Sequence, residues 1–142
     1  MPIPRKLASF LRLRAADRFL VCEAILVLGL ARAVLLVVPF RVLAKRLARA
    51  PGTDCHDDLL IRRVRGAVTV AAKNVSWNAV CLPQAMAAKA MLARRGYGSA
   101  VHFGATIEAD GKIGAHAWLT AGDTVVVGAA GMHSMSHLAR FG

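Results

Sequence analysis

The chain has 142 residues, 56% of them hydrophobic, and its 19 Lys and Arg against eight Asp and Glu give a net charge of +11. This length fits one domain and excludes two full ones, and so apolar a composition argues against a disordered chain. Ten of the bases fall within residues 1–50. Charge alone would suit nucleic acid, an anionic lipid surface or an acidic partner. Because the sequence has no zinc-finger spacing, aromatic RNA-binding motif or Gly-rich phosphate loop, we expect no nucleic-acid partner.

The first strong element is an apolar stretch over residues 15–38, which predicts one helix of about six turns with Asp17 as its N-cap. The stretch is long enough to cross a bilayer, but Glu23 and Arg32 interrupt it, and charges inside a membrane are costly. We favour a helix buried against the domain and a partner. Interfacial association and membrane spanning remain open alternatives.

Three further helical segments follow. Residues 40–49 predict a short basic amphipathic helix, and a Pro-Gly-containing break comes next. Asp57 and Asp58 open a helix that ends near Asn74, with the acids at its positive end. A strong helix then begins at Cys81 and is terminated by Gly96.

After residue 98 the hydrophobic period changes from 3.6 to 2. Residues 100–108, 113–121 and 124–129 predict three antiparallel strands, with turns at 110–111 and 122–123. The tail has no clear element. The order therefore predicts an α+β fold in which residues 1–50 form N-terminal helices packed on a core of residues 51–142, all within one structural domain.

The cysteines, Cys22, Cys55 and Cys81, are odd in number, contain no CxxC pair, and accompany no signal-peptide pattern. A reducing cytoplasm is the expected setting, with peripheral contact to the inner membrane left open. Cys22 falls inside an apolar helix and is expected in the core. The run Cys55 to Asp58 carries metal-friendly side chains, but four consecutive residues do not converge on one ion, so we expect no metal and no other cofactor.

Cys81 and His116 form the candidate reacting pair. A thiol at a helix N-terminus feels the positive end of the helix dipole, which favours the nucleophilic thiolate. His116, on the second predicted strand, lies 35 residues downstream. A Cys at the start of a helix facing a His on the adjoining sheet allows the imidazole to take the thiol proton and later protonate the leaving amine. Trp118 would point to the same sheet face as His116 and wall the site, or belong to the core.

Two segments, CLPQAMAAKAMLARRGY (81–97) and AHAWLTAGDTVVVG (115–128), resemble the transglutaminase-like, papain-related domain of lasso-peptide maturation B proteins, in particular the stand-alone leader-peptidase half. The N-terminal segments 4–35 and 39–49 also resemble these B proteins. The resemblance implies a cysteine peptidase that removes the leader from a ribosomally made precursor. It maps the nucleophile onto Cys81 and the general base onto His116.

The resemblance also implies partners. These are the precursor peptide, a small PqqD-like protein that grips the leader, and an ATP-dependent, asparagine-synthetase-like cyclase that closes the macrolactam. Because the chain length leaves no room for a fused recognition domain, we expect dependence on the leader-binding partner. The apolar and basic N-terminal helices would offer a docking surface for that partner, for the cyclase or for the membrane.

The sequence departs from the family pattern at the group that orients the imidazole. Many such domains carry an Asp twelve residues after the His, and that position here is Gly128. Asp123 is the next candidate, but it sits in the turn at the far end of the hairpin, beyond hydrogen-bond reach of His116. A backbone carbonyl, Asn78 or His133 remains open for this role, as does a Cys-His dyad without a third member.

An oxyanion site would need donors near the sulfur. The Cys81 backbone N–H is available, and the side-chain amide of Asn78 is a better candidate for the second donor than that of Gln84.

Three rival interpretations of the function stay open. The first is a scaffold that has lost catalysis, which the missing Asp at position 128 supports. The others are a membrane-bound basic protein and an enzyme that transfers the acyl group to an amine instead of water.

Overall fold

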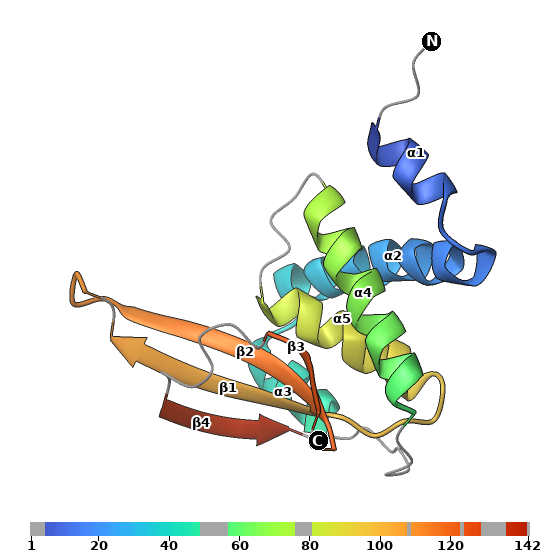
Figure 1. Ribbon diagram of the computed structural model, residues 1–142. Helices are drawn as coiled ribbons and strands as arrows, with labels where there is room; N and C mark the ends of the chain where they lie inside the picture. Colours follow the sequence, from blue (N-terminus) through green and yellow to red (C-terminus); the bar gives the residue numbers. More distant parts are fainter. Residues whose placement is uncertain are drawn as a thin grey trace.

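The computed structural model describes residues 5–48, 57–75, 81–107, 109–122, 124–128 and 136–141 (Figure 1). Five helices precede an antiparallel sheet, as the α+β prediction requires. The elements in chain order are α1 (Arg5–Leu11), α2 (Ala15–Val37), α3 (Phe40–Ala48), α4 (Asp58–Asn74), α5 (Cys81–Ala93), β1 (Ala100–Ile107), β2 (Ile113–Ala121), β3 (Thr124–Val127) and β4 (Ser136–Phe141).

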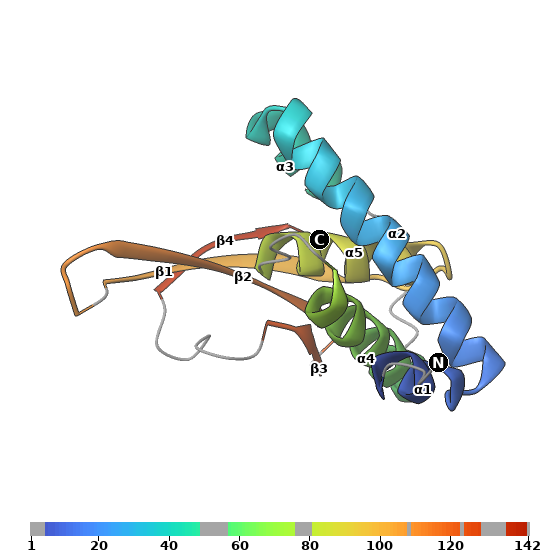
Figure 2. The ribbon, with the colours of Figure 1, turned by 90° about the horizontal axis from the view of Figure 1, so that it is seen from above.

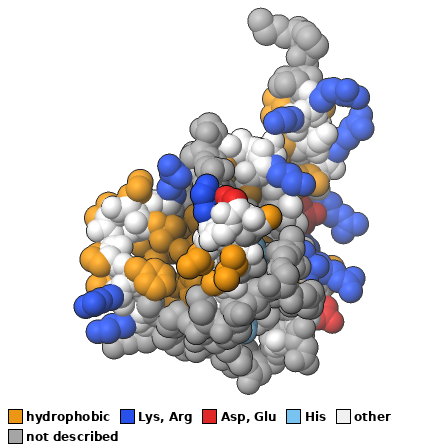
Figure 3. Space-filling view, turned by 90° about the vertical axis from the view of Figure 1, so that its left-hand side faces the viewer, with side chains coloured by type: hydrophobic (Ala, Val, Ile, Leu, Met, Phe, Trp, Pro, Cys, Tyr) orange, Lys and Arg blue, Asp and Glu red, His pale blue; other side chains and the backbone are white. Residues whose placement is uncertain are grey.

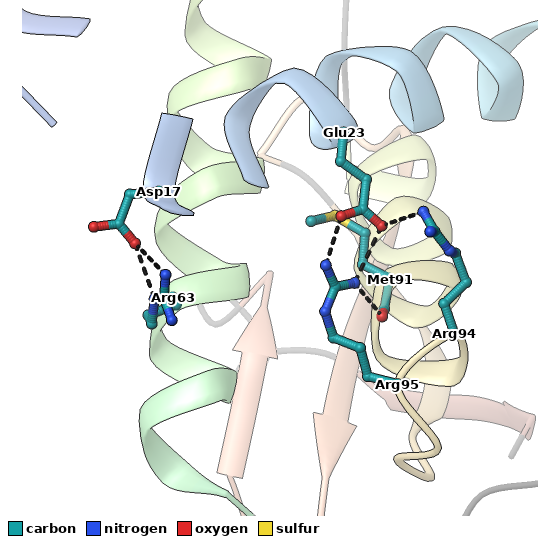
Figure 4. A network of polar contacts seen from close by, with 6 residues as sticks. All are labelled: Asp17, Glu23, Arg63, Met91, Arg94 and Arg95. Carbon is teal, nitrogen blue, oxygen red and sulfur yellow. Dashed lines mark hydrogen bonds and ion pairs between the residues drawn. The ribbon is translucent and has the colours of Figure 1, made fainter. Parts of the chain in front are cut away.

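The helix starts follow local capping chemistry, with one exception. The Asp57 carboxylate accepts from the backbone N–H of Leu59 at 3.0 Å and so caps α4 as predicted. The prediction that Asp17 caps α2 is wrong, because the helix begins earlier, after Arg14. Asp17 lies inside the first turn, where a carboxylate is still favourable. There it accepts from Arg63 Nε at 2.9 Å and ties α2 to α4 (Figure 4).

The sheet has four strands in the order β3-β2-β1-β4, all antiparallel. The three predicted strands are present, and β2 has the predicted bounds. The expectation of a tail without an element is wrong, because residues 136–141 form β4 and pair with β1. The tail lacks apolar alternation, so its strand conformation depends on the ladder offered by β1 and not on its own pattern.

One core joins the N-terminal helices to the rest of the chain. Figure 2 shows α2 crossing the helical layer diagonally, while the β1–β2 hairpin reaches away from the helices. The largest fully buried side chains come from α2, α4, α5 and the sheet, and they include Leu28, Val68, Met91, Val101 and Leu119. Burial of such side chains stabilises a fold by roughly 1.5–3 kcal/mol each. The helix that carries Cys81 is therefore held between α2, α4 and the sheet.

A partly buried ionic network fixes the far end of α5 (Figure 4). The Glu23 side chain on α2 is buried, and its carboxylate accepts from Arg95 Nη2 at 2.6 Å and from Arg94 Nη1 at 2.7 Å. The hydrogen bond from Arg95 is the main cause that lowers the pKa of Glu23 below its ordinary value. The charge that interrupts the apolar pattern of α2 is thus neutralised inside the protein.

The outer side of α2 differs from the expectation for a core helix. Cys22, expected in the core, is exposed. Residues of α2 are apolar on most of its circumference, so composition did not reveal which side faces the protein. At the surface, Lys and Arg side chains outnumber Asp and Glu, with hydrophobic side chains among them on the face seen in Figure 3.

Candidate active site

Cys81 is the first residue of α5 and is partly buried. The first N–H groups of a helix have no acceptor inside it, so the backbone around this thiol offers free donors and a positive dipole end. Pro83, which lacks an N–H, is tolerated in this first turn and is buried. The local sequence thus places a thiol where negative charge on sulfur is favoured.

His116 lies on β2, the strand against which α5 packs. Its Nε2 is 2.7 Å from the backbone carbonyl oxygen of Gly128. A carbonyl oxygen only accepts, so Nε2 must carry the proton and donate. In the neutral ring this leaves Nδ1 with the lone pair, which is the nitrogen a general base needs.

Gly128 supplies this carbonyl through a backbone that other residues do not tolerate. Its φ is +83°, and a Cβ at this position would come within 2.7 Å of the Ala117 carbonyl oxygen and 2.8 Å of the Trp118 Cβ. Only glycine combines the left-handed conformation with so close an approach. Many domains of the family that the sequence resembles have an Asp at this position. This chain instead orients His116 by the backbone carbonyl of Gly128.

Arg65 of α4 holds the strand that leads to Gly128. Its Nε donates to the Val126 carbonyl at 3.0 Å, and its Nη2 donates to the Val125 carbonyl. β3 is an edge strand with β2 as its neighbour in the sheet, so these hydrogen bonds tie its backbone to a helix as well as to the sheet. The guanidinium joins α4 to β3 at Val125 and Val126, shortly before the Gly128 carbonyl that orients His116. This arrangement makes Arg65 a positioning residue.

An open cleft of about 370 Å³ lies beside this carbonyl. It connects the first turn of α5 with the end of β3, since Gln84 from α5 and Gly128 both line it. Cys81 precedes Gln84 by three positions, so the two side chains lie on neighbouring parts of the helix surface. The lining residues are Arg65, Thr69, Gln84, Val125, Val126, Val127 and Gly128.

Trp118 lies beside His116 with 6.2 Å between ring centroids and 22° between ring planes. The indole is only 6% exposed, and His102 of β1 stacks on it at 5.4 Å. His102 Nε2 is also 2.8 Å from Thr120 Oγ1. The imidazole of His116 is therefore confined on one side by a fixed aromatic ring.

Within the described part of the chain, no hydrogen bond joins Cys81 to His116. Catalytic hydrogen bonds are often long without substrate and tighten when it binds. Asn78, Asp123 and His133, the other candidates for orienting or oxyanion roles, lie outside the described residues. Among the described residues, no group of His, Cys, Asp and Glu is arranged to hold a metal ion.

A sequence model of the Transglutaminase-like superfamily matches residues 24–140. The chain belongs to this superfamily. Its members include cysteine peptidases and acyl transferases, for which a Cys at a helix start and a His on the adjoining sheet are the expected reacting groups. No curated protein and no solved structure matches significantly. The match to the transglutaminase-like superfamily begins within α2 and ends within β4.

Two contributors to this transglutaminase-like site were missed in the sequence. Gly128 was noted only for the absent Asp, although a glycine after an apolar strand is itself a signal for positive φ or close backbone approach. Arg65 looked like one base among several on the polar face of α4. Its partners are 60 and 61 positions away in the chain, and no local pattern reveals them.

Proposed function

We propose that this transglutaminase-like protein is a cysteine peptidase that removes the leader peptide from a lasso-peptide precursor. Two observations carry the proposal: Cys81 is the first residue of α5, and His116, on the strand packed against α5, has its tautomer fixed by the Gly128 carbonyl. The peptide-bond target and the precursor class come from the resemblance of segments 81–97 and 115–128 to lasso-peptide B proteins.

The reaction begins when Nδ1 of His116 takes the proton of the Cys81 thiol. The sulfur attacks the scissile carbonyl carbon, a C–S bond forms, and the carbonyl π electrons move to oxygen. The Cys81 backbone N–H and a second donor, for which Asn78 is the candidate, stabilise that oxyanion. The C–N bond then breaks as the imidazolium returns its proton to the leaving amine. Water hydrolyses the resulting thioester with His116 as base, which restores the thiol.

The Gly128 carbonyl has a defined part in this cycle. It accepts a hydrogen bond from Nε2–H in both the neutral and the protonated ring, so the imidazole keeps its orientation throughout. A neutral carbonyl stabilises the imidazolium less than a carboxylate would. The proposal therefore combines a dyad with a backbone acceptor, and does not require a third side chain.

Substrate would reach the site through the cleft between α5 and the end of β3. This cleft is large enough for a few residues of an extended peptide beside Gly128, and Arg65 occupies two carbonyls of the edge strand β3. A flanking segment would therefore contact the lining side chains more than the strand edge. The open shape suits a flexible precursor better than a folded substrate.

The leader itself would be held by a separate PqqD-like partner, and the trimmed product would pass to the ATP-dependent cyclase. A second, apolar groove of about 820 Å³ between α1, α2 and α4 supports a protein partner here. Phe10, Val21 and Val70 line it, together with the basic residues Arg5 and Lys6. An amphipathic segment with acidic residues is complementary to such a groove.

The test is leader cleavage followed by mass spectrometry. A precursor peptide is mixed with its leader-binding protein and with wild-type protein, Cys81→Ala or, as the matched control, Cys22→Ala. We expect one cut in wild type and Cys22→Ala, and a loss of more than about 10³-fold in Cys81→Ala. If folded wild-type protein binds the partner but leaves the precursor intact, the non-catalytic scaffold replaces the peptidase.

Water is the acceptor in this proposal, and an amine acceptor is the alternative. Both reactions share the thioester, so Cys81→Ala does not separate them. Mass spectrometry of the products does, because hydrolysis leaves a free carboxylate on the leader, while transfer to an amine adds the mass of that amine.

A further inference from the structure

The outward side of α2 carries a continuous apolar stripe. Phe19, Leu26, Leu30 and Val37 are 57% to 82% exposed, although each has a large hydrophobic side chain. Exposed residues recur every three or four positions, which places them on one side of the helix. The outer stripe consists of Phe19, Cys22, Leu26, Leu30, Ala33 and Val37, all exposed. It runs for about 27 Å at 1.5 Å per residue.

Basic side chains border this outer stripe. Arg14 and Arg32 are exposed on one flank at helical spacing, Arg18 beside them is half-buried, and Arg41, Lys45 and Arg46 of the following helix are exposed. The two acids of this region point elsewhere, since Asp17 pairs with Arg63 and Glu23 is buried with Arg94 and Arg95. Among the described residues, none of these six bases forms an ion pair. The stripe is thus apolar in the middle and cationic at its margins.

We propose that the outer stripe lies on an anionic lipid bilayer, with α2 parallel to the membrane plane. An apolar face with Arg and Lys at its border is the arrangement of interfacial helices, whose basic side chains reach the headgroups while the apolar side chains enter the acyl boundary. Each Lys or Arg near an anionic surface adds about 1 kcal/mol of attraction. This inference does not depend on the proposed peptidase.

The opposite side of α2 decides between lying on the membrane and spanning it. The helix is long and apolar enough to cross a bilayer. However, Leu20, Ala24 and Leu28 are buried in the core, and Glu23 is locked to Arg95. Spanning would pull these contacts apart and carry a carboxylate into hydrocarbon. Lying on the surface keeps the core and the ionic network intact.

A lipid surface also suits the outer stripe better than a protein partner does. Protein interfaces concentrate their energy in pockets that receive anchor side chains. Stripe residues line neither the cleft beside β3 nor the groove next to α1. An exposed helical stripe that lines neither of these hollows and is bordered by cations without ion pairs among the described residues fits a deformable anionic surface.

The first measurement is flotation of the full chain with vesicles of phosphatidylglycerol and phosphatidylcholine, or of phosphatidylcholine alone. We expect wild type to float with the anionic vesicles. Leu26→Gln with Leu30→Gln should reduce the bound fraction more than tenfold, and Arg14→Gln with Arg32→Gln about fivefold for each cation removed. The matched control is Ile107→Gln with Ile113→Gln, which removes two hydrophobic side chains that are 77% and 78% exposed at the remote hairpin. It should bind like wild type.

A second readout uses the thiols and needs no stripe variant. In a Cys55→Ser background, anionic vesicles should protect Cys22, within the stripe, from a water-soluble thiol reagent and leave the reaction of Cys81 unchanged. Several results would overturn the proposal: no flotation of folded wild type, equal loss in the hairpin control, or resistance of the bound chain to alkaline carbonate, which would indicate spanning. If wild type forms a dimer without lipid and the Leu26→Gln, Leu30→Gln variant is a monomer, the stripe contacts a second copy of the chain instead.

Discussion

The two ends of α5 are built in opposite ways. At the C-terminal end, the buried Glu23 of α2 receives hydrogen bonds from Arg94 and Arg95. At the N-terminal end, Cys81 is partly accessible, and Gln84 of the same first turn lines an open cleft. The comparison teaches that this helix is anchored by charge at the end remote from the proposed nucleophile, while among the described residues no ion pair anchors the end that carries Cys81. Variants at the two ends should therefore separate stability from chemistry.

The largest effect is expected at the reactive end. His116→Ala removes the proposed general base and acid, and such a group contributes about 10²–10⁴-fold in rate. The folded state should lose little, because the imidazole is only partly buried. Leader cleavage by mass spectrometry measures the rate, and thermal unfolding measures the stability. The double variant with Cys81→Ala should be no slower than Cys81→Ala alone, and a further loss would show that the two residues act independently.

Gly128→Ala should lower both the stability of the fold and the rate of leader cleavage. The new Cβ meets the Ala117 carbonyl and Trp118, and the positive φ is unfavourable, so we expect roughly 2–4 kcal/mol of destabilisation and more than tenfold slower cleavage. Gly128→Asp should not restore a triad, since its Cβ makes the same contacts. Restored or increased activity in Gly128→Asp would contradict the role assigned to the backbone carbonyl. Gly111→Ala is the control for positive φ without crowding.

Glu23→Gln should lower stability and spare the chemistry. The variant leaves Arg95 without its charged acceptor, which we expect to cost roughly 2–3 kcal/mol. Because the pKa of Glu23 is lowered in the folded protein, its contribution is present above the ordinary carboxyl range and is lost as the pH falls through the lowered value. The difference in unfolding free energy between wild type and Glu23→Gln should therefore shrink in acid. A constant difference across this range would show that the charge is not responsible.

Arg65→Met should have the smallest effect. It keeps the aliphatic stem on α4 but removes both hydrogen bonds to β3, which are worth about 1 kcal/mol each. As a positioning residue, Arg65 should change cleavage by about tenfold through kcat with little change in KM. Arg62→Met on the same helix is the matched control, since Arg62 is exposed. Equal losses in both variants would reduce Arg65 to a general stabilising role.

Elements with a strong local pattern were predictable from the sequence. The 3.6-residue period and Asp57 predicted α4, and alternation between two turns predicted β2. Strand β4 was missed because residues 136–141 have no alternation, and its conformation depends on pairing with β1. Local signals determine an element's type, but they do not report a partner strand far along the chain.

The site was predictable to the level of residue types and no further. Cys81 at a helix start and His116 on a strand could be placed from capping and period. The Glu23 network could not, since its partners are 71 and 72 positions away. Cys22 was placed on the wrong side of α2, because an almost uniformly apolar helix carries no signal for its buried face.

The most direct test of the central claim compares two thiols of the same protein. In a Cys55→Ser background without lipid, Cys81 and Cys22 compete for limiting iodoacetamide near neutral pH, with and without His116→Ala. If Cys81 is the activated nucleophile, it should react at least about tenfold faster than Cys22 although Cys22 is the more exposed, and His116→Ala should abolish this advantage. If Cys22 reacts first and His116→Ala changes nothing, Cys81 is not the nucleophile.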